Sequence, residues 1–148
     1  SMGGVPSRAC RRFIRRLADE KKIPVYVFTD SDPYGWYIYS VIKIGSMNLA
    51  HVSNKLSTPS AKFIGLTVSD IYNYGLENAT IKAKDVDLKR ARDLLDYEWF
   101  QHDAWEKEIK LMLQKKVKAE QEALAQKNLK FVSETYLPEK IENKEFLP

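Results

Sequence analysis

The sequence predicts an α/β domain in which helices flank a partly parallel sheet. Two short apolar runs, at residues 25–28 and 63–66, have the composition of strands buried on both faces. Segments with helical periodicity alternate with these runs, and such alternation favours parallel pairing. From about residue 100 the pattern is helical, so we expect a mostly helical C-terminal part packed on the sheet.

A basic helix is expected first, from an N-cap at Ser7 to about residue 22, before Pro24. Its apolar positions share one side: Cys10, Phe13, Ile14 and Leu17. Five arginines share the other side, within an arc of roughly 140°: Arg8, Arg11, Arg12, Arg15 and Arg16. The first 22 residues carry seven basic and two acidic residues, a net of +5 against +4 for the whole chain. This face fits contact with nucleic-acid phosphates, or it is only the solvated side of the helix.

The other elements follow in order. A turn at residues 29–35 leads into a buried helix from Trp36 to about Ile44, which Gly45 ends. A short strand at 47–52, a loop at 54–60 and the strand at 63–66 come next. A helix capped by Ser69 follows and ends at Gly75. Three further helices are expected at 87–95, 104–127 and 131–141. The aromatic residues after the first strand belong to the core: Tyr34, Trp36, Tyr37 and Tyr39.

Composition limits the function classes. The 148 residues suffice for one domain, with residues 1–3 read as an expression-tag remnant and 4–148 as the domain. No apolar run approaches the roughly 18 residues of a membrane span. The single cysteine, Cys10, excludes a disulfide framework and fits a reducing compartment. His51 and His102 match no zinc-protease spacing, and there is no P-loop.

The residues that best fit a chemical role are Asp30 and Asp32, one residue apart at the end of an apolar strand. Ligand sites of open α/β sheets lie at the carboxyl ends of strands. Mg²⁺ prefers oxygen ligands and is commonly held by one or two carboxylates together with substrate phosphates. By spacing alone, however, aspartates in a turn more often serve as turn formers and helix caps.

Several stretches are similar to a known family. Residues 24–39, Pro-Val-Tyr-Val-Phe-Thr-Asp-Ser-Asp-Pro-Tyr-Gly-Trp-Tyr-Ile-Tyr, resemble the second acidic motif of the Toprim domain in archaeal-type topoisomerase VI, where it lies in the A subunit. They resemble less closely the meiotic relative that makes double-strand breaks. Residues 5–12, 62–71, 105–110 and 117–124 resemble further parts of that Toprim domain. The likeness covers nearly all of residues 4–148.

The resemblance implies a function. In that family a tyrosine attacks a DNA phosphodiester, and Mg²⁺ held by Toprim acids stabilises the charge on the phosphate. Asp30 and Asp32 would be the metal ligands, catalytic through the metal, and the five arginines would contact double-stranded DNA. The implied partners are a second copy of the A subunit, forming a homodimer, and an ATP-binding B subunit. Together they carry out type IIB double-strand passage. The implied location is the cytoplasm and nucleoid of an archaeal cell, with no membrane.

This sequence departs from the family pattern at its start. The family places the Toprim glutamate, on an earlier strand, and the attacking tyrosine upstream of the basic helix. Residues 1–7 contain no acid, and none of the eight tyrosines occupies the nucleophile's position. We therefore expect the first strand of the domain to be missing and the chain alone not to cleave DNA.

Two other functions remain open. A non-catalytic nucleic-acid-binding module could use the arginine helix, with Asp30 and Asp32 in structural roles. A phosphatase with an aspartyl nucleophile also places Asp-Xaa-Asp after an apolar strand. That class usually has Thr or Val soon after the second aspartate, where this chain has Pro33 and Tyr34.

Overall fold

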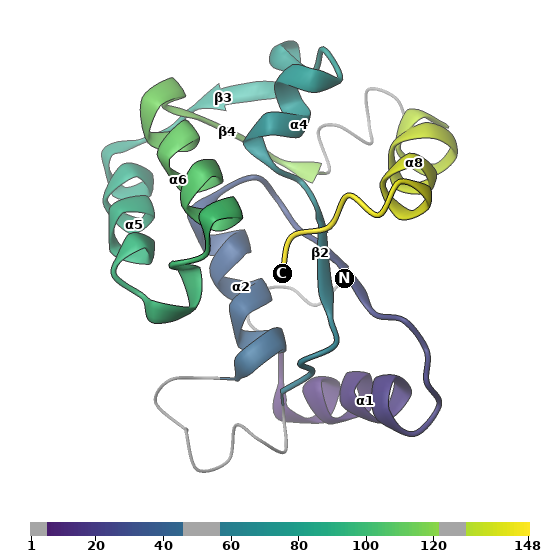
Figure 1. Cartoon of the computed structure of the whole chain (residues 1–148). Helices are drawn as coiled ribbons and strands as arrows, with labels where there is room; N and C mark the ends of the chain where they lie inside the picture. The colour runs from purple at the N-terminus through teal and green to yellow at the C-terminus, as the bar shows by residue number, and fades with distance from the viewer. Residues whose placement is uncertain (1–5, 46–56, 122–129) are drawn as a thin grey trace.

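Two parallel strands lie at the centre of the molecule (Figure 1). The computed structural model describes residues 6–45, 57–121 and 130–148. Strand β1 covers Tyr26–Phe28 and β2 covers Lys62–Gly65, with Val27 opposite Phe63 and a register shift after Val27. The predicted α/β class and the parallel pairing are therefore confirmed.

Helix α2, Pro33–Ile44, provides the crossover that parallel pairing requires. It leaves the carboxyl end of β1 and runs back along the sheet (Figure 1). Its side chains are apolar nearly all round, and Trp36 and Tyr39 are fully buried, as predicted. Gly45 ends the helix with φ 87°, a conformation that favours glycine. The strand expected at residues 47–52 lies outside the described residues.

Helices α5, Asp85–Leu95, and α6, Asp103–Lys115, pack on one side of α2 (Figure 1). A short 3₁₀ turn, Glu98–Phe100, connects them. Trp105 of α6 is fully buried and meets four aromatic rings: Trp36, Tyr39, Phe63 and Phe100. These contacts join the helical layer to both α2 and β2. The helix predicted at 87–95 is confirmed.

A second, smaller core lies on the other side of β2, under α8 (Figure 1). It is formed by α4, Val68–Asn73, a π-helical turn, Phe131–Tyr136, and α8, Leu137–Glu142. The last two confirm the helical segment predicted at 131–141. The N-cap of α4 is Thr67, not Ser69 as predicted, because Thr67 forms a reciprocal capping box with Asp70.

The helix predicted at 104–127 is too long. Lys116 adopts a left-handed conformation with φ 55° and ends α6, and the chain then forms strand β4, Val117–Ala119. This strand pairs antiparallel with β3, Thr80–Lys82, which follows a 3₁₀ turn at Glu77–Ala79. Apart from this short strand, the described residues after about 100 are mostly helical, as expected. Near the end of the chain, Leu147 also forms an antiparallel bridge with Phe63.

Helix α1, Arg8–Asp19, begins as predicted, because the Ser7 hydroxyl accepts the N–H of Cys10 at 3.2 Å. The two predicted faces are not both observed. Arg11 is only 6% exposed, whereas Phe13, expected on the apolar side, is 61% exposed. Among the residues that the structure describes, no helix combines the length and apolar character that crossing a membrane requires.

Candidate metal site

Asp32 lies at the start of α2 and caps it. Its backbone is extended, and its Oδ1 accepts the N–H of Gly35 at 2.5 Å. Pro33 follows at the first helical position. An N–H there would have no partner within the helix, so its absence in proline costs no hydrogen bond. The helix therefore begins at Pro33 and not at Trp36. The cap role is confirmed, and it uses only one of the two carboxylate oxygens.

Asp30 is held from the other side of the turn by β4 and the residues after it. The main chains of Ser31 and Ala119 exchange two hydrogen bonds, of 2.8 Å and 3.1 Å. Two residues further on, the N–H of Gln121 donates to Asp30 Oδ1 at 2.9 Å. The acid pair, Asp30 and Asp32, is thus fixed between a helix and a strand that are distant in sequence.

Gly35 is required by the close approach of α2 to this turn. A Cβ at residue 35 would lie 2.8 Å from the carbonyl oxygen of Asp30 and 3.2 Å from Asp32 Oδ1. Any side chain there would displace the backbone of the turn. The Asp-Pro-Tyr-Gly order therefore has a geometric reason in addition to the resemblance that it carries.

The groups around Asp32 balance its negative charge only in part. Burial raises the pKa of Asp32, and the negative charges of Asp30 and Asp87 act in the same direction. The N–H of Gly35 and the ammonium of Lys118 lower the pKa, but they do not cancel the rise. A cation between the two aspartates would relieve this unfavourable charge.

The acid pair fits a hard divalent cation. Oδ1 of each aspartate accepts a backbone N–H, and no described residue bonds to the Oδ2 of either one. Within the described ranges, no group of three or more His, Cys, Asp or Glu side chains converges on one point. Two carboxylates are a common protein contribution to a Mg²⁺ site that phosphate oxygens complete.

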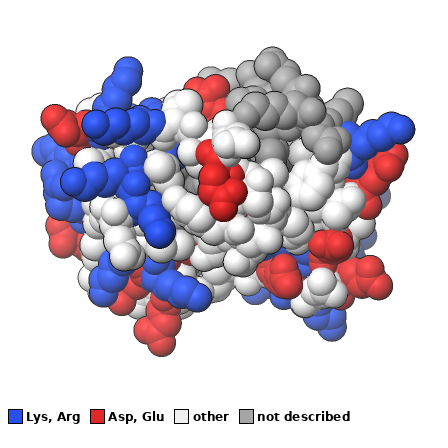
Figure 2. Space-filling view, turned by 90° about the horizontal axis from the view of Figure 1, so that it is seen from above, with Lys and Arg blue, Asp and Glu red and all other residues white. Residues whose placement is uncertain are grey.

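An ion pair that the sequence did not predict lies close to Asp32. Lys118 Nζ is 2.9 Å from Asp87 Oδ2, with side-chain exposures of 19% and 10%. Burial alone would raise the pKa of Asp87, but Lys118 and the N–H of Lys84 hold it below its ordinary value. Figure 2 shows this end of the molecule from above, with Lys and Arg densest at the left and further ones, mixed with Asp and Glu, along the lower and right edges. No local pattern could have brought residues 87 and 118 together.

The arginines of α1 do not join the acid pair. Helix α1 lies at the opposite end of β1 from the turn that holds Asp30 and Asp32 (Figure 1). Two of its arginines are paired within the helix, Arg15 with Asp19 at 3.0 Å and Arg16 with Glu20 at 3.4 Å. Since Arg11 is also buried, fewer guanidinium groups face solvent than the helical pattern predicted.

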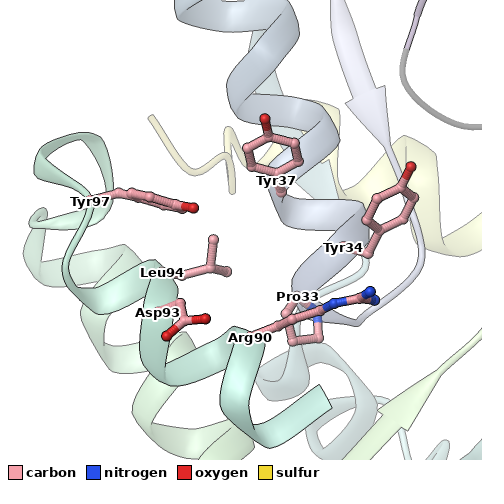
Figure 3. Close-up of a pocket in the computed structure, with 7 residues that line it drawn as sticks. All are labelled: Pro33, Tyr34, Tyr37, Arg90, Asp93, Leu94 and Tyr97. Carbon is pink, nitrogen blue, oxygen red and sulfur yellow. The ribbon is translucent and has the colours of Figure 1, made fainter. Parts of the chain in front are cut away.

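A cavity of about 230 Å³ opens beside the acid pair, between α2 and α5 (Figure 3). It is lined by Pro33, Tyr34, Tyr37, Arg90, Asp93, Leu94 and Tyr97. Tyr34 is 44% exposed, with the guanidinium of Arg90 lying 5.8 Å from its ring centre. The assignment of Tyr34 to the core is therefore wrong, because its side chain projects from the first turn of α2 (Figure 3).

A comparison with protein-family models matches nearly the whole chain. The model is that of the Toprim domain shared by Spo11 and the topoisomerase 6 A subunit, and it matches residues 1–141. That range includes the acid pair, the ion pair beside it and both small sheets.

Similar proteins carry the name of the Type 2 DNA topoisomerase 6 A subunit. The one from Saccharolobus shibatae is 50% identical over 97% of this chain and 40% of its own length. The one from Pyrococcus horikoshii is 51% identical over 98% of this chain and 41% of its own length. The one from Methanothermobacter thermautotrophicus is 48% identical over 94% of this chain and 39% of its own length. The chain thus spans about two fifths of these relatives.

Proposed function

This chain belongs to the Toprim domain family of Spo11 and the topoisomerase 6 A subunit, and we propose that it is the metal-holding part of a DNA-cleaving A subunit. The observation that carries the proposal is the acid pair at the carboxyl end of β1. Each carboxylate there has one oxygen fixed by a backbone N–H and a second oxygen without a partner among the described residues.

The proposed site residues are Asp30 and Asp32, and the metal is Mg²⁺. The bonds to the Oδ1 atoms restrict the orientation of the two carboxylates, and in the proposed site both Oδ2 atoms bind one cation. Bound Mg²⁺ would stabilise the charge that develops on a DNA phosphate during cleavage and rejoining. The N-terminus of α2, which begins at Pro33, adds a partial positive charge near that phosphate.

The proposed reaction is that of a type IIB topoisomerase, in which one duplex passes through a break in another. The attacking tyrosine would come from a part of the protein outside the residues matched here. The proposed partners are double-stranded DNA, a second copy of the A subunit in a homodimer, and an ATP-binding B subunit. The proposed location is the cytoplasm and nucleoid of an archaeal cell. The arginines of α1, chiefly the exposed Arg8 and Arg12, would contact phosphates away from the acid pair.

Titration with Mn²⁺, followed by electron paramagnetic resonance, tests the metal site. The wild-type chain should bind Mn²⁺, and Asp30→Asn or Asp32→Asn should weaken binding tenfold or more. Asparagine keeps an acceptor for the N–H of Gln121 or Gly35, so the fold should persist. Asp96→Asn, the same change at an exposed residue after α5, should have no effect. Equal affinities in all four proteins would refute the metal site.

The activity itself is tested in a full-length protein that carries this domain, assembled with its ATP-binding partner. Asp30→Ala there should abolish ATP-dependent relaxation of supercoiled DNA. Unchanged relaxation would show that the acid pair has no part in cleavage.

A further inference from the structure

We propose that Lys118 of β4 is a further residue of the metal site, where its ammonium binds an oxygen of the DNA phosphate. The inference rests on the proposed function, in which the acid pair and its metal hold a phosphate of the DNA backbone. Lys118 is distant from both aspartates in the sequence, and the fold alone brings it to them.

The register of the acid turn against β4 places Lys118 opposite Asp32. Ser31 and Ala119 exchange both main-chain hydrogen bonds, so they lie directly opposite each other. Asp32 has an extended backbone, with φ −150° and ψ 163°, and Lys118 is the middle residue of β4. The next pair along is therefore Asp32 with Lys118, whose side chains leave the face opposite to those of Ser31 and Ala119. The Cβ atoms of such a pair lie about 4.5–5.5 Å apart.

Asp87 holds Lys118 in place and leaves part of the ammonium for a ligand. The Nζ atom of Lys118 lies 2.9 Å from Asp87 Oδ2, and no other described residue forms a salt bridge with this lysine. An ammonium group has three N–H donors, of which one carboxylate oxygen takes one. The side chain of Lys118 is 19% exposed, so a ligand can reach it from solvent. A held ammonium beside the acid pair suits an anionic oxygen.

The balance of charge at the site calls for such a cation. The two negative charges of the acid pair neutralise a bound Mg²⁺, so the phosphate needs a further positive charge. The charge of Lys118 already acts on Asp32, whose pKa it lowers. Asp87 does not depend on Lys118 alone, because the N–H of Lys84 donates to its Oδ2 at 2.9 Å and the charge of Arg90 also lowers its pKa.

A purely structural salt bridge predicts a different behaviour. Lys118 and Asp87 join β4 to the first turn of α5, which begins at the same end of the molecule (Figure 1). If that link were the whole role, removing either partner would loosen the same contact. DNA affinity would then change in the same direction in both variants. If Lys118 binds phosphate, the two variants should change it in opposite directions.

Two single variants and two matched controls make this comparison in the 148-residue chain. The test variants are Lys118→Met and Asp87→Asn, and asparagine at 87 keeps an acceptor for the N–H of Lys84. The controls are Lys107→Met and Asp85→Asn, which make the same charge changes at exposed residues. Circular dichroism and thermal melting verify that all four variants fold.

The readout is the affinity for a fluorescein-labelled DNA duplex, measured by anisotropy in Mg²⁺ at several KCl concentrations. Lys118→Met should reduce the slope of log K against log salt by about 0.9, the value for one phosphate contact. It should also bind about tenfold more weakly at low salt, because a hydrogen bond to a charged group is lost. Asp87→Asn should bind more tightly than the wild type, since the ammonium is released to the phosphate. Both controls should match the wild type.

Three results would overturn the inference. They are a wild-type salt slope in Lys118→Met, weaker DNA binding in both test variants, and a rise in Asp85→Asn as large as that in Asp87→Asn. If Lys118→Met does not fold, the direction of the change in Asp87→Asn decides. The Mn²⁺ titration keeps the two proposals apart. A wild-type chain that binds no Mn²⁺ refutes the proposed function, whereas an unchanged slope in a chain that binds Mn²⁺ refutes only the role of Lys118.

Discussion

The main-chain N–H of Ser31 donates to the carbonyl of Ala119 at 2.8 Å, and the N–H of Ala119 donates back to Ser31 at 3.1 Å. Ser31 is fully buried between the two half-buried aspartates of the turn, and Ala119 is buried with it. The turn that carries Asp30 and Asp32 is therefore held by main-chain hydrogen bonds to β4, as a strand in a sheet is held by its neighbour. Perturbations of the turn should change both stability and cation binding.

Neutralising Asp32 should stabilise the metal-free protein. Because burial and the charge of Asp30 raise the pKa of Asp32 in the folded state, its ionised form is less favourable there than in the unfolded chain. Its contribution to stability therefore falls as pH rises through the ordinary range of aspartate and into that of the raised pKa. Asp32→Asn in EDTA at about pH 7.5 should melt at a higher temperature than the wild type.

The order should reverse when metal is present. Saturating Mg²⁺ stabilises only a folded protein that binds it, by about 2.7 kcal/mol at one hundred times the dissociation constant. Differential scanning calorimetry with and without Mg²⁺ measures both effects. A lower melting temperature of Asp32→Asn in EDTA would contradict the idea that the acid pair is electrostatically unfavourable when empty.

Gly35→Ala should damage the turn. The new methyl group would lie 2.8 Å from the carbonyl oxygen of Asp30, so the backbone must move. We expect a loss of about 1–3 kcal/mol in the free energy of unfolding, the range for overpacking a dense site. Cation affinity should fall too, because the displaced atoms orient both carboxylates.

Gly75→Ala is the control for that substitution. Gly75 has φ 66° and no atom within 4 Å of the added Cβ, so the cost is backbone strain of about 1 kcal/mol. Urea unfolding and Mn²⁺ titration compare the two variants. Gly35→Ala with normal cation affinity would show that the close approach does not position the aspartates.

Removing Lys140 should leave a buried charge without its partner. Asp70 and Lys140 are both buried, 3.0 Å apart, and the hydroxyl of Tyr136 donates to Asp70 at 2.6 Å. Lys140→Met should cost about 3–5 kcal/mol, because the carboxylate of Asp70 stays buried. Chemical denaturation measures the loss, with the exposed Lys144→Met as control.

The double variant Asp70→Asn/Lys140→Met separates the charge effect from packing. With no ionised carboxylate left behind, it should be more stable than Lys140→Met alone. A double variant that is less stable than the single one would mean that the ion pair itself, and not the orphaned charge, dominates.

Lys43→Met should remove a dependence of stability on pH. Burial, reinforced by the charge of Lys62, lowers the pKa of Lys43 from 10.5 to about 8, and its Nζ donates to the carbonyl of Ala61 at 2.7 Å. Between about pH 8 and 10 the folded state releases a proton that the unfolded chain keeps, so stability rises with pH in this window. The wild type should gain at most about 1.4 kcal/mol per pH unit relative to the variant. Parallel slopes for the two proteins across this window would contradict the lowered pKa.

Local sequence signals predicted the centre of the fold well. The apolar runs at 25–28 and 63–66 largely coincide with β1 and β2, and Gly45 ends the helix between them. The start of that helix was misplaced, although Asp32 followed by Pro33 is an N-cap followed by the favoured first residue. The error came from treating the turn residues as turn alone.

The pairing of β4 with β3 and with the acid turn could not be predicted. Residues 116–119 lie in a helical context, yet 117–119 form β4 because β3 and the acid turn offer backbone partners on either side. Likewise, Arg11 is buried by tertiary packing that a helical projection does not contain.

The two aspartates depend on different parts of the molecule. Asp30 is bonded to Gln121, just beyond β4, and Asp32 is bonded to Gly35 in α2. A ligand that shifts β4 against α2 would therefore change the distance between the Oδ2 atoms of the two aspartates. By thermodynamic reciprocity, if such a ligand changes the affinity of the acid pair for a cation, the cation changes the affinity for the ligand by the same factor. A cation bound as proposed and such a ligand would then be mutual effectors, linked through the backbone of one turn.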